Sequence, residues 1–348
     1  MSGRGGKPAA GTSPAGNPLA GRSPTVEWPR FSGTGALRLG MGRERVIITG
    51  AGGWLGLATL EMLHALLGEA IHDRVICFGS RQRSLKLRGG LTLEQRPLDA
   101  LSDLTREPSL LLHLAFLTQE RAKGMSPEAY TAANWGISLK VMAALNKVGV
   151  RGVFLASSGA VNLADDARAP RSKRVYGALK LEDEARFTGW AEDTGGRLVI
   201  ARIFNLAGPY INKGVSYALA AFIADALAGR PIEIQATHRV YRSYVAIEEL
   251  MSVVVGALTA EASGVVAFET AGEASPEIDG VAHAVADTLA PRLKVLRPAM
   301  TRDLPDRYVG DGAAFHALGE AYAVRQVSFA EQIRQTADYM AEYAEVWE

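Results

Sequence analysis

Arg45-Val46-Ile47-Ile48-Thr49-Gly50-Ala51-Gly52-Gly53-Trp54-Leu55-Gly56 is the stretch that decides the fold of this 348-residue chain. The apolar run 45–49 predicts a buried strand, and the spacing of apolar residues in 55–67 predicts a helix directly after the glycines. Glycine at three regular positions keeps side chains out of the tight turn, the approach of a diphosphate and the helix–strand contact. The free N–H groups at the start of the helix then attract phosphates. We therefore predict a dinucleotide-binding loop in which the cofactor contacts are Gly50, Gly53, Trp54, Leu55 and Gly56.

Downstream of this loop, apolar strands alternate with helical segments. Strands are expected at 74–78, 91–96, 109–114, 152–156 and 198–203, and long helices at 127–148 and 175–194. Strands that are apolar on both sides belong to a parallel sheet with helices on both faces. Right-handed crossovers make such a sheet doubly wound. The predicted fold class is α/β: a Rossmann-type doubly wound parallel sheet with a smaller C-terminal α/β lobe.

Composition divides the chain into parts. Residues 1–40 are rich in Gly, Pro and Ser without apolar periodicity, so we predict a disordered tail there, with Met41 as a possible start. We assign 41–208 to the dinucleotide-binding domain, with about 236–272 returning to it. The regular alternation loosens after Asn205, and we assign 209–235 and 273–348 to a substrate-binding lobe.

Charge and cysteine content exclude several classes of function. The formal net charge is +1, which argues against a nucleic-acid or membrane-surface partner, because such proteins carry a basic excess. No apolar run reaches the ~18 residues that a membrane span needs. Cys77 is the single cysteine, so a disulfide within the chain is impossible and a cysteine-based metal site is disfavoured. We expect a buried Cys77, no metal and a cytoplasmic location.

The end of the second predicted strand bears on the choice of cofactor. An acidic residue there usually holds the ribose 2′-hydroxyl of NAD. Gly79 stands at that place instead, and Ser80, Arg81 and Arg83 follow. Guanidinium groups form charge-assisted hydrogen bonds with a 2′-phosphate. We therefore predict NADP, with NAD as the alternative. If no cofactor phosphate binds here, the same residues form an ordinary solvated basic loop.

Tyr176 and Lys180 lie four residues apart at the start of a predicted helix, which places both side chains on one face. We expect the lysine charge to lower the pKa of the phenol from about 10. The tyrosine would then exchange a proton with an alcohol or sugar oxygen while hydride moves to or from a nicotinamide. The same spacing is common on solvated helix faces. Ser157 and Ser158 favour catalysis, because they end the fifth strand at the edge of the sheet where ligands bind.

With these motifs in this order, the chain resembles the extended short-chain dehydrogenase/reductase family, in its nucleotide-sugar epimerase/dehydratase branch, over about residues 44–345. The loop 49–56 has the family's TGxxGxxG form, and residues 113–116 resemble its His-Leu-Ala-Ala strand end. The resemblance implies that Leu114 and Ala115 border the cofactor.

Other positions gain roles only through this resemblance. Asp99 matches an aspartate that contacts adenine, and Asn134 loosely matches the Asn-x-x-Gly-Thr helix motif and joins the catalytic set. The family's Ser/Thr position selects Ser158 over Ser157. The residues that the resemblance places at the cofactor as well as in the catalytic set are Tyr176 and Lys180.

The second half of the chain resembles the family's substrate-binding segments. Asn205 matches a residue that typically contacts the substrate diphosphate, and Arg242 matches an arginine that holds a phosphate. Arg302 is a further candidate phosphate ligand. For Arg242 the alternative is a surface ion pair with Glu248 or Glu249. The resemblance also implies a nucleotide-linked sugar as substrate and a homodimer formed through helices 127–148 and 175–194.

Gly159 and Ala160 narrow the reaction, because the resemblance implies an Asp-Glu pair at this place in 4,6-dehydratases. Dehydration is therefore disfavoured, which leaves 4-keto reduction or 4-epimerisation of the nucleotide-linked sugar. The NADP-like second strand favours reduction, since NADPH is commonly a consumed reductant and an epimerase recycles a bound cofactor. A non-catalytic, regulatory dinucleotide-binding protein is the second alternative. The joint presence of the serine, tyrosine and lysine argues against it.

Overall fold

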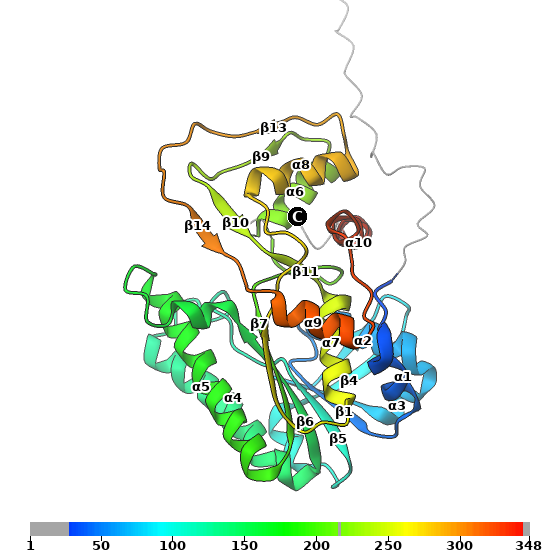
Figure 1. Ribbon diagram of the computed structural model, residues 1–348. Coiled ribbons are helices and arrows are strands. Elements are labelled where there is room, and N and C mark those ends of the chain that lie inside the picture. Colours follow the sequence, from blue (N-terminus) through cyan, green and yellow to red (C-terminus); the bar gives the residue numbers. More distant parts are fainter. Residues whose placement is uncertain (1–27, 215–216, 344–348) are drawn as a thin grey trace, which may run out of the picture.

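The computed structural model describes residues 28–214 and 217–343 and contains the expected doubly wound sheet (Figure 1). Eight strands lie in the order β12-β7-β6-β5-β1-β2-β4-β3. All neighbouring pairs are parallel except β3 with β4. The strands are β1 (Arg45–Thr49), β2 (Val75–Gly79), β3 (Arg83–Lys86), β4 (Thr92–Pro97), β5 (Ser109–His113), β6 (Val150–Ser158), β7 (Arg197–Ile203) and β12 (Gly264–Glu269). The α/β fold class is confirmed.

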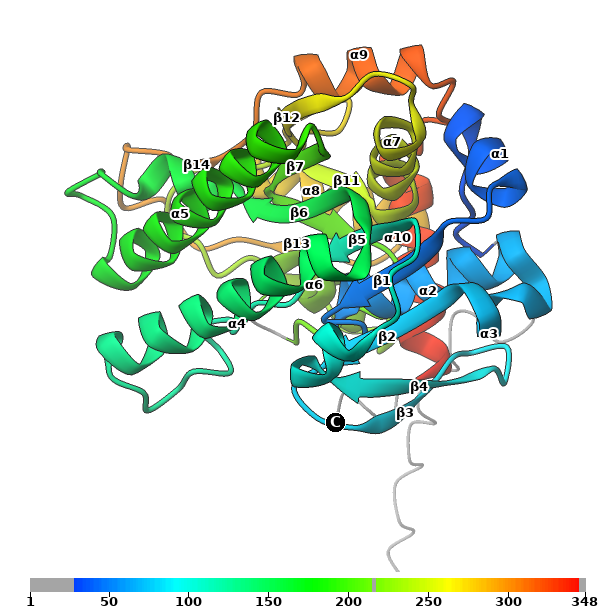
Figure 2. The same cartoon turned by 90° about the horizontal axis from the view of Figure 1, so that it is seen from below.

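Helices cover both faces of this sheet. Helices α4 (Pro127–Val148) and α5 (Arg171–Thr194) lie on one face, and α2 (Trp54–Leu67) and α7 (Ile247–Thr259) lie on the other (Figures 1 and 2). Alternate side chains of β1 serve the two cores: Ile47 packs with the α4 side, while Val46 and Ile48 pack with the α2 side. Because every residue of β1 is buried, this strand is a continuous apolar run rather than an alternating one.

The predicted disordered tail is wrong for residues 28–40, whereas residues 1–27 lie outside the described part of the chain. Helix α1 (Gly33–Met41) packs against α7. A Cβ on Gly35 would lie 2.4 Å from the backbone nitrogen of Gly256, so the two helices touch through their backbones. The backbone N–H of Arg30 also donates to Glu248. The high glycine content argued against a helix in this segment, yet glycine is what permits the close contact between α1 and α7. A chain that started at Met41 would lack this helix.

A smaller lobe, above the sheet in Figure 1, is built from the second half of the chain. Its helices α6 (Ala218–Leu227), α8 (Ile278–Leu289) and α10 (Phe329–Glu342) pack on one another. Short parallel pairs complete it: β8 (Asn205–Ala207) with β11 (Tyr244–Ala246), β9 (Ile232–Glu233) with β13 (Val295–Leu296), and β10 (Val240–Arg242) with β14 (Asp306–Tyr308). The assignment of all of 273–348 to the lobe is wrong for α9 (Ala313–Ala321). This helix packs on α7 and β12, with the Phe315 ring 5.6 Å from the Phe268 ring.

Two properties of the helices bear on a membrane or a second copy of the chain as partner. Residues Trp54–Arg74, which include 3-10 helix η1 (Gly68–Ala70) and helix α3 (Ile71–Arg74), form the one helical stretch among the described residues that is long and apolar enough to cross a membrane. The expectation that no stretch of this length is apolar enough does not hold here; the first 14 residues of this stretch cover the sheet as α2. On α4, Trp135 and Leu139 are exposed by 41% and 58%. The homodimer expected through this face stays a prediction that a solution mass measurement would test.

Helix α1 supplies a test of its own packing with a matched pair of leucines. Leu39 is 2% exposed and Leu37 is 66% exposed. We expect Leu39→Ala to lower the free energy of unfolding by about 2–4 kcal/mol, because it leaves a cavity under α7. Leu37→Ala is the control and should change it by less than about 0.5 kcal/mol. The measurement is urea denaturation; equal, small effects of both substitutions would show that α1 is not docked.

Candidate active site

The glycine loop has the geometry that a dinucleotide requires. Gly50 has φ +75°, and a Cβ on it would lie 2.7 Å from the chain at Leu114 and Ala115. A Cβ on Gly56 would lie 2.4 Å from the carbonyl oxygen of Ala51, so this glycine lets α2 approach the loop. Gly53 is the N-cap of α2, and no side chain caps the helix. Its first N–H groups are therefore available to phosphate oxygens, and the residues present fit the diphosphate of a nicotinamide dinucleotide.

The place expected for an acidic residue is filled by Gln95 of β4. Its side chain lies so close to Gly79 that a Cβ there would be 2.4 Å from the amide. The Gln95 amide accepts from the N–H of Gly52 and donates to the carbonyl of Arg81. Arg83 donates to the carbonyl oxygen of Gly52 at 2.9 Å. No carboxylate stands at the end of β2, and a guanidinium lies against the loop instead.

A third arginine approaches this cluster from the segment that follows β5. Burial, then the charges of Arg81 and Arg121, lower the pKa of Arg83. Within the described ranges, none of these three arginines has a carboxylate partner. Ser80 is exposed beside them. Asp99, expected at the adenine, lies in the 3-10 helix η2 (Leu98–Asp103) and forms an ion pair with Lys140 of α4.

Tyr176 and Lys180 share one face of α5, but the pKa of the phenol is shifted in the opposite direction from the expectation. The Lys180 ammonium donates to the carbonyl oxygen of Ala156 at 2.8 Å and lies 3.8 Å from the centre of the Phe116 ring. The same ring meets the Tyr176 ring edge-on at 5.4 Å. Burial raises the pKa of Tyr176 above its usual range and lowers that of Lys180 to about 8. The predicted lowering of the phenol pKa by Lys180 is therefore wrong in this structure, because burial is the largest effect on the phenol and raises its pKa.

Ser158 ends β6 beside two phenols. Its Oγ lies 3.2 Å from the hydroxyl of Tyr308 and accepts from the backbone N–H of Ala160. The same serine lowers the pKa of Tyr176, against the larger effect of burial. The serine preferred from the resemblance thus faces Tyr176. Ser157 does not, because its hydroxyl donates to the buried carboxylate of Glu184 at 2.5 Å.

The space beside Ser158 is aromatic. A Cβ on Gly159, the first residue of the 3-10 helix η3 (Gly159–Leu163), would lie 2.5 Å from the Phe204 ring. Phe204 in turn packs on Tyr308, with ring centres 4.7 Å apart. A larger side chain at position 159 therefore has no room unless Phe204 moves.

Neighbouring polar groups have structural partners. The Asn134 amide accepts from the N–H of Leu117 at 2.8 Å and donates to its carbonyl, so it holds the segment after β5 in place. His113 hydrogen bonds to Thr49 at 2.7 Å, and burial lowers its pKa to about 3, which makes it a neutral link between β5 and β1. Cys77 is 1% exposed, as expected, and burial raises its pKa to about 12.

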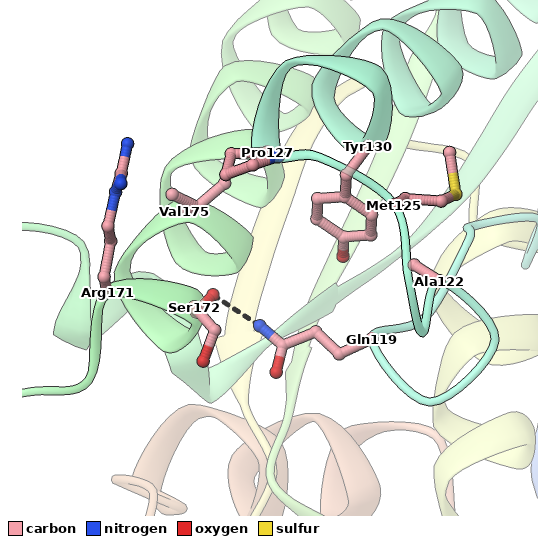
Figure 3. Close-up of a pocket in the computed structure, with 8 residues that line it drawn as sticks. All are labelled: Gln119, Ala122, Met125, Pro127, Tyr130, Arg171, Ser172 and Val175. Carbon is pink, nitrogen blue, oxygen red and sulfur yellow. Dashed lines mark hydrogen bonds between the residues drawn. The ribbon is translucent and has the colours of Figure 1, made fainter.

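A pocket of about 300 Å³ opens next to the start of α5 (Figure 3). It lies between the segment after β5 and the N-terminal turns of α4 and α5, and Val175, the neighbour of Tyr176, lines it. Among the residues that the structure describes, the buried Tyr130 hydroxyl has no hydrogen-bond partner, and the Gln119 amide donates to the backbone of Ser172 across the pocket. The pocket is therefore an apolar recess with a free phenol donor beside the candidate catalytic tyrosine.

The three candidate substrate residues are placed differently. Arg242 is paired with Asp306 at 2.8 Å rather than with Glu248 or Glu249, so the alternative partners named for it are wrong. Asn205 donates to the carbonyl oxygen of Ser243. Both lie on the short strands that join the lobe to the sheet. Arg302 is exposed in the connection between β13 and β14, and its role as a phosphate ligand stays a prediction.

Comparison with known proteins agrees with this geometry. Residues 46–268 match the profile of the NAD dependent epimerase/dehydratase family. The chain belongs to this family. A probable UDP-glucuronate 4-epimerase of Rhizobium meliloti (strain 1021) is 24% identical over 231 residues, which cover 61% of this chain and 67% of that protein. UDP-glucuronic acid decarboxylase 4 of Arabidopsis thaliana is 22% identical over 302 residues, covering 82% and 67%.

Solved structures show the same fold. UDP-N-acetylglucosamine 4-epimerase from Methanobrevibacter ruminantium M1, in complex with UDP-N-acetylmuramic acid, superposes with a TM-score of 0.67 at 21% identity, covering 87% of this chain and 99% of that one. A Thermus thermophilus UDP-glucose 4-epimerase in complex with NAD gives 0.63 at 21% identity, covering 86% and 99%. This epimerase/dehydratase family member is thus an NAD(P)-dependent enzyme of the nucleotide-sugar branch of extended short-chain dehydrogenases/reductases.

Sequence reasoning missed several residues of this family member's site. Gln95, Phe204 and Tyr308 line it, yet each comes from an element whose position is set by long-range packing. Nothing in the local pattern around Tyr308 placed it near Ser158. The glycine at position 159 was the one available signal, because a missing side chain at a crowded strand end implies a large neighbour.

The buried Lys180 gives this family member a pH-dependent stability. Its pKa falls from 10.5 in the unfolded chain to about 8, so between these values the unfolded state binds more protons. Stability therefore rises with pH across this window. We expect the wild-type protein to gain stability relative to Lys180→Met as pH rises from about 8 to 10.5, measured by urea denaturation. Lys147→Met, on the exposed side of α4, is the control: it keeps Lys180 and should follow the wild-type curve. Parallel curves for all three proteins would contradict the burial of the ammonium.

Proposed function

We propose that the protein reduces a 4-keto group on a nucleotide-linked sugar, with NADPH as the hydride donor and Tyr176 as the proton donor. The observation that carries the proposal is the cluster of Arg81, Arg83 and Arg121 at the glycine loop, which has no carboxylate partner among the described residues. Three neighbouring guanidinium groups repel one another, and a 2′-phosphate relieves this repulsion through charge-assisted hydrogen bonds. NADP is a consumed reductant more often than a permanently bound cofactor, which favours net reduction.

The protonation state of the phenol supports the direction of the reaction. Burial raises the pKa of Tyr176, so the phenol is protonated at neutral pH, the form that gives a proton to a carbonyl oxygen. The cofactor supplies the hydride when bound. Ser158 hydrogen bonds to the same oxygen as negative charge grows on it, and the N-terminus of α2 with Lys180 holds the cofactor beside them. The products are the sugar alcohol and the oxidised cofactor.

The crowding at Gly159 argues against elimination of water as an alternative. A dehydratase needs an acid and a base on the sugar in addition to the tyrosine, and the Phe204 ring fills the space where the side chain of residue 159 would lie. An aromatic ring has no proton to exchange. The chemistry that the site supports is therefore hydride and proton transfer at one carbon.

A 4-epimerase with tightly bound NAD is the second candidate. The similar proteins favour it, because a probable UDP-glucuronate 4-epimerase and two 4-epimerase structures are among them. In that reaction Tyr176 first removes a proton and later returns it. The two candidates share every residue described above and differ in whether cofactor is consumed.

The assay that separates them uses purified protein, NADPH and a panel of nucleotide-linked 4-keto-6-deoxysugars. We expect NADPH oxidation in proportion to sugar reduced, and a loss of about 10²–10⁴-fold in kcat for Tyr176→Phe with cofactor affinity retained. Absence of NADPH oxidation, with interconversion of a 4-hydroxyl epimer pair, would replace reduction by epimerisation. Cofactor binding without either turnover, unchanged in Tyr176→Phe, would indicate a regulatory protein.

The choice of cofactor has its own test. Arg83→Ala removes the guanidinium that lies on the loop, and we expect it to weaken NADPH binding about 10–100-fold while NADH binding changes less than about threefold. Arg96→Ala, on the exposed side of β4, is the matched control. Calorimetric titration with both cofactors measures the effect. Equal losses for NADPH and NADH would show that Arg83 contacts a group that the two cofactors share.

A further inference from the structure

Tyr308 reaches the candidate active site from a distant part of the chain. It ends β14, and Ser158 ends β6, so 150 residues separate two hydroxyls whose oxygens lie 3.2 Å apart. The Tyr308 ring is held by Phe204, which occupies the space above Gly159. The volume beside Ser158 that a side chain at position 159 would take is thus filled by the Phe204 ring, and the phenol from the C-terminal lobe packs against that ring.

The hydrogen bonds of Ser158 decide what that phenol does. A serine hydroxyl has one proton to donate and two lone pairs to accept with. One lone pair accepts the backbone N–H of Ala160. When Tyr308 donates to the other, the only bond left for Ser158 is donation of its own proton, toward Tyr176 or the reacting oxygen. Burial raises the pKa of Tyr308, so its hydroxyl keeps a proton to donate at neutral pH.

We propose that Tyr308 is a positioning residue that holds the Ser158 hydroxyl as a hydrogen-bond donor to the reacting sugar oxygen. The inference rests on the proposed function for the identity of that oxygen. A serine that accepts twice donates in one direction only, and a preoriented donor stabilises developing negative charge without reorganising during the reaction. Tyr308 itself does not touch the reacting atoms.

The same strand pairing connects this role to substrate binding. Tyr308 and Arg242 are register partners in the β10–β14 pair, and Asp306 on the same strand holds Arg242 at 2.8 Å. The candidate phosphate ligand and the residue that orients Ser158 therefore belong to one small rigid unit. Binding of a substrate phosphate at Arg242 fixes the strand that carries Tyr308, so a substrate without that phosphate is expected to lose kcat as well as affinity.

The charged and titratable groups around the two phenols come from several elements. Arg242 and Glu269 face Tyr308 from β10 and β12, and Tyr176 faces it from α5. Tyr130 and Glu120 act on Tyr176 from α4 and the segment after β5. Of these groups, Tyr308 forms the hydrogen bond to Ser158.

The test is a double-mutant cycle on Ser158 and Tyr308. Tyr308→Phe keeps the ring on Phe204 and removes only the hydroxyl. We expect kcat to fall about tenfold with KM within about twofold, and Ser158→Ala to lower kcat about a hundredfold. The double variant should be no slower than Ser158→Ala alone, since Tyr308 acts through the serine. Tyr241→Phe, on the neighbouring strand β10, is the matched control and should change neither constant.

A parallel cycle in urea denaturation measures the contact without substrate. Coupling between the two positions supports the hydrogen bond itself, and its absence overturns the inference. Effects on kcat that multiply in the double variant, or an unchanged kcat in Tyr308→Phe, also overturn it while the proposed function stands. A wild-type protein that turns over neither substrate type overturns the proposed function instead, and with it the catalytic consequence of the contact.

Discussion

The buried carboxylate of Glu184 is the group on which the arrangement of the site depends. It lies one turn beyond Lys180 on α5, accepts from Ser157 at the end of β6, and receives both Nε and Nη2 of Arg202 from β7. One side chain therefore binds the catalytic helix to two adjacent strands. A paired and hydrogen-bonded charge is tolerated inside a protein, whereas a lone one is costly, so the three groups hold one another in a single geometry. The same contacts occupy Ser157 and leave the neighbouring Ser158 to face Tyr176.

Local sequence chemistry was sufficient for the first half of the fold. Helix α4 begins and ends where expected, because Ser126 caps its first turn, Pro127 starts it, and Gly149 ends it with φ +81°. The strand, loop and helix of residues 45–67 were predicted equally well from the sequence. Helix α1 was not, since its stability comes from close contact with α7 rather than from periodicity. The two- and three-residue strands of the lobe are too short for any pattern to show.

The sequence predicted which residues meet at the candidate site but not the direction of the pKa shift of Tyr176. Tyr176, Lys180 and Ser158 do come together, because strand ends of a parallel sheet and the start of a crossing helix share one edge. The sign of the phenol pKa shift was wrong, since desolvation depends on neighbours such as Phe116 that arrive from elsewhere. Spacing within one helix describes two side chains on a common face. It does not describe what separates them.

The pairing of β10 with β14 has a consequence for how such a site changes specificity. Only three residues of each strand pair, Val240–Arg242 with Asp306–Tyr308, so few backbone hydrogen bonds hold the alignment. Side chains alternate along a strand, and a slip of one position exchanges the two faces. Arg307, which now lies over the Tyr241 ring, would then occupy the place of Tyr308. A single inserted or deleted residue in the connection before β14 would exchange a neutral hydroxyl beside Ser158 for a full positive charge, without altering the main sheet.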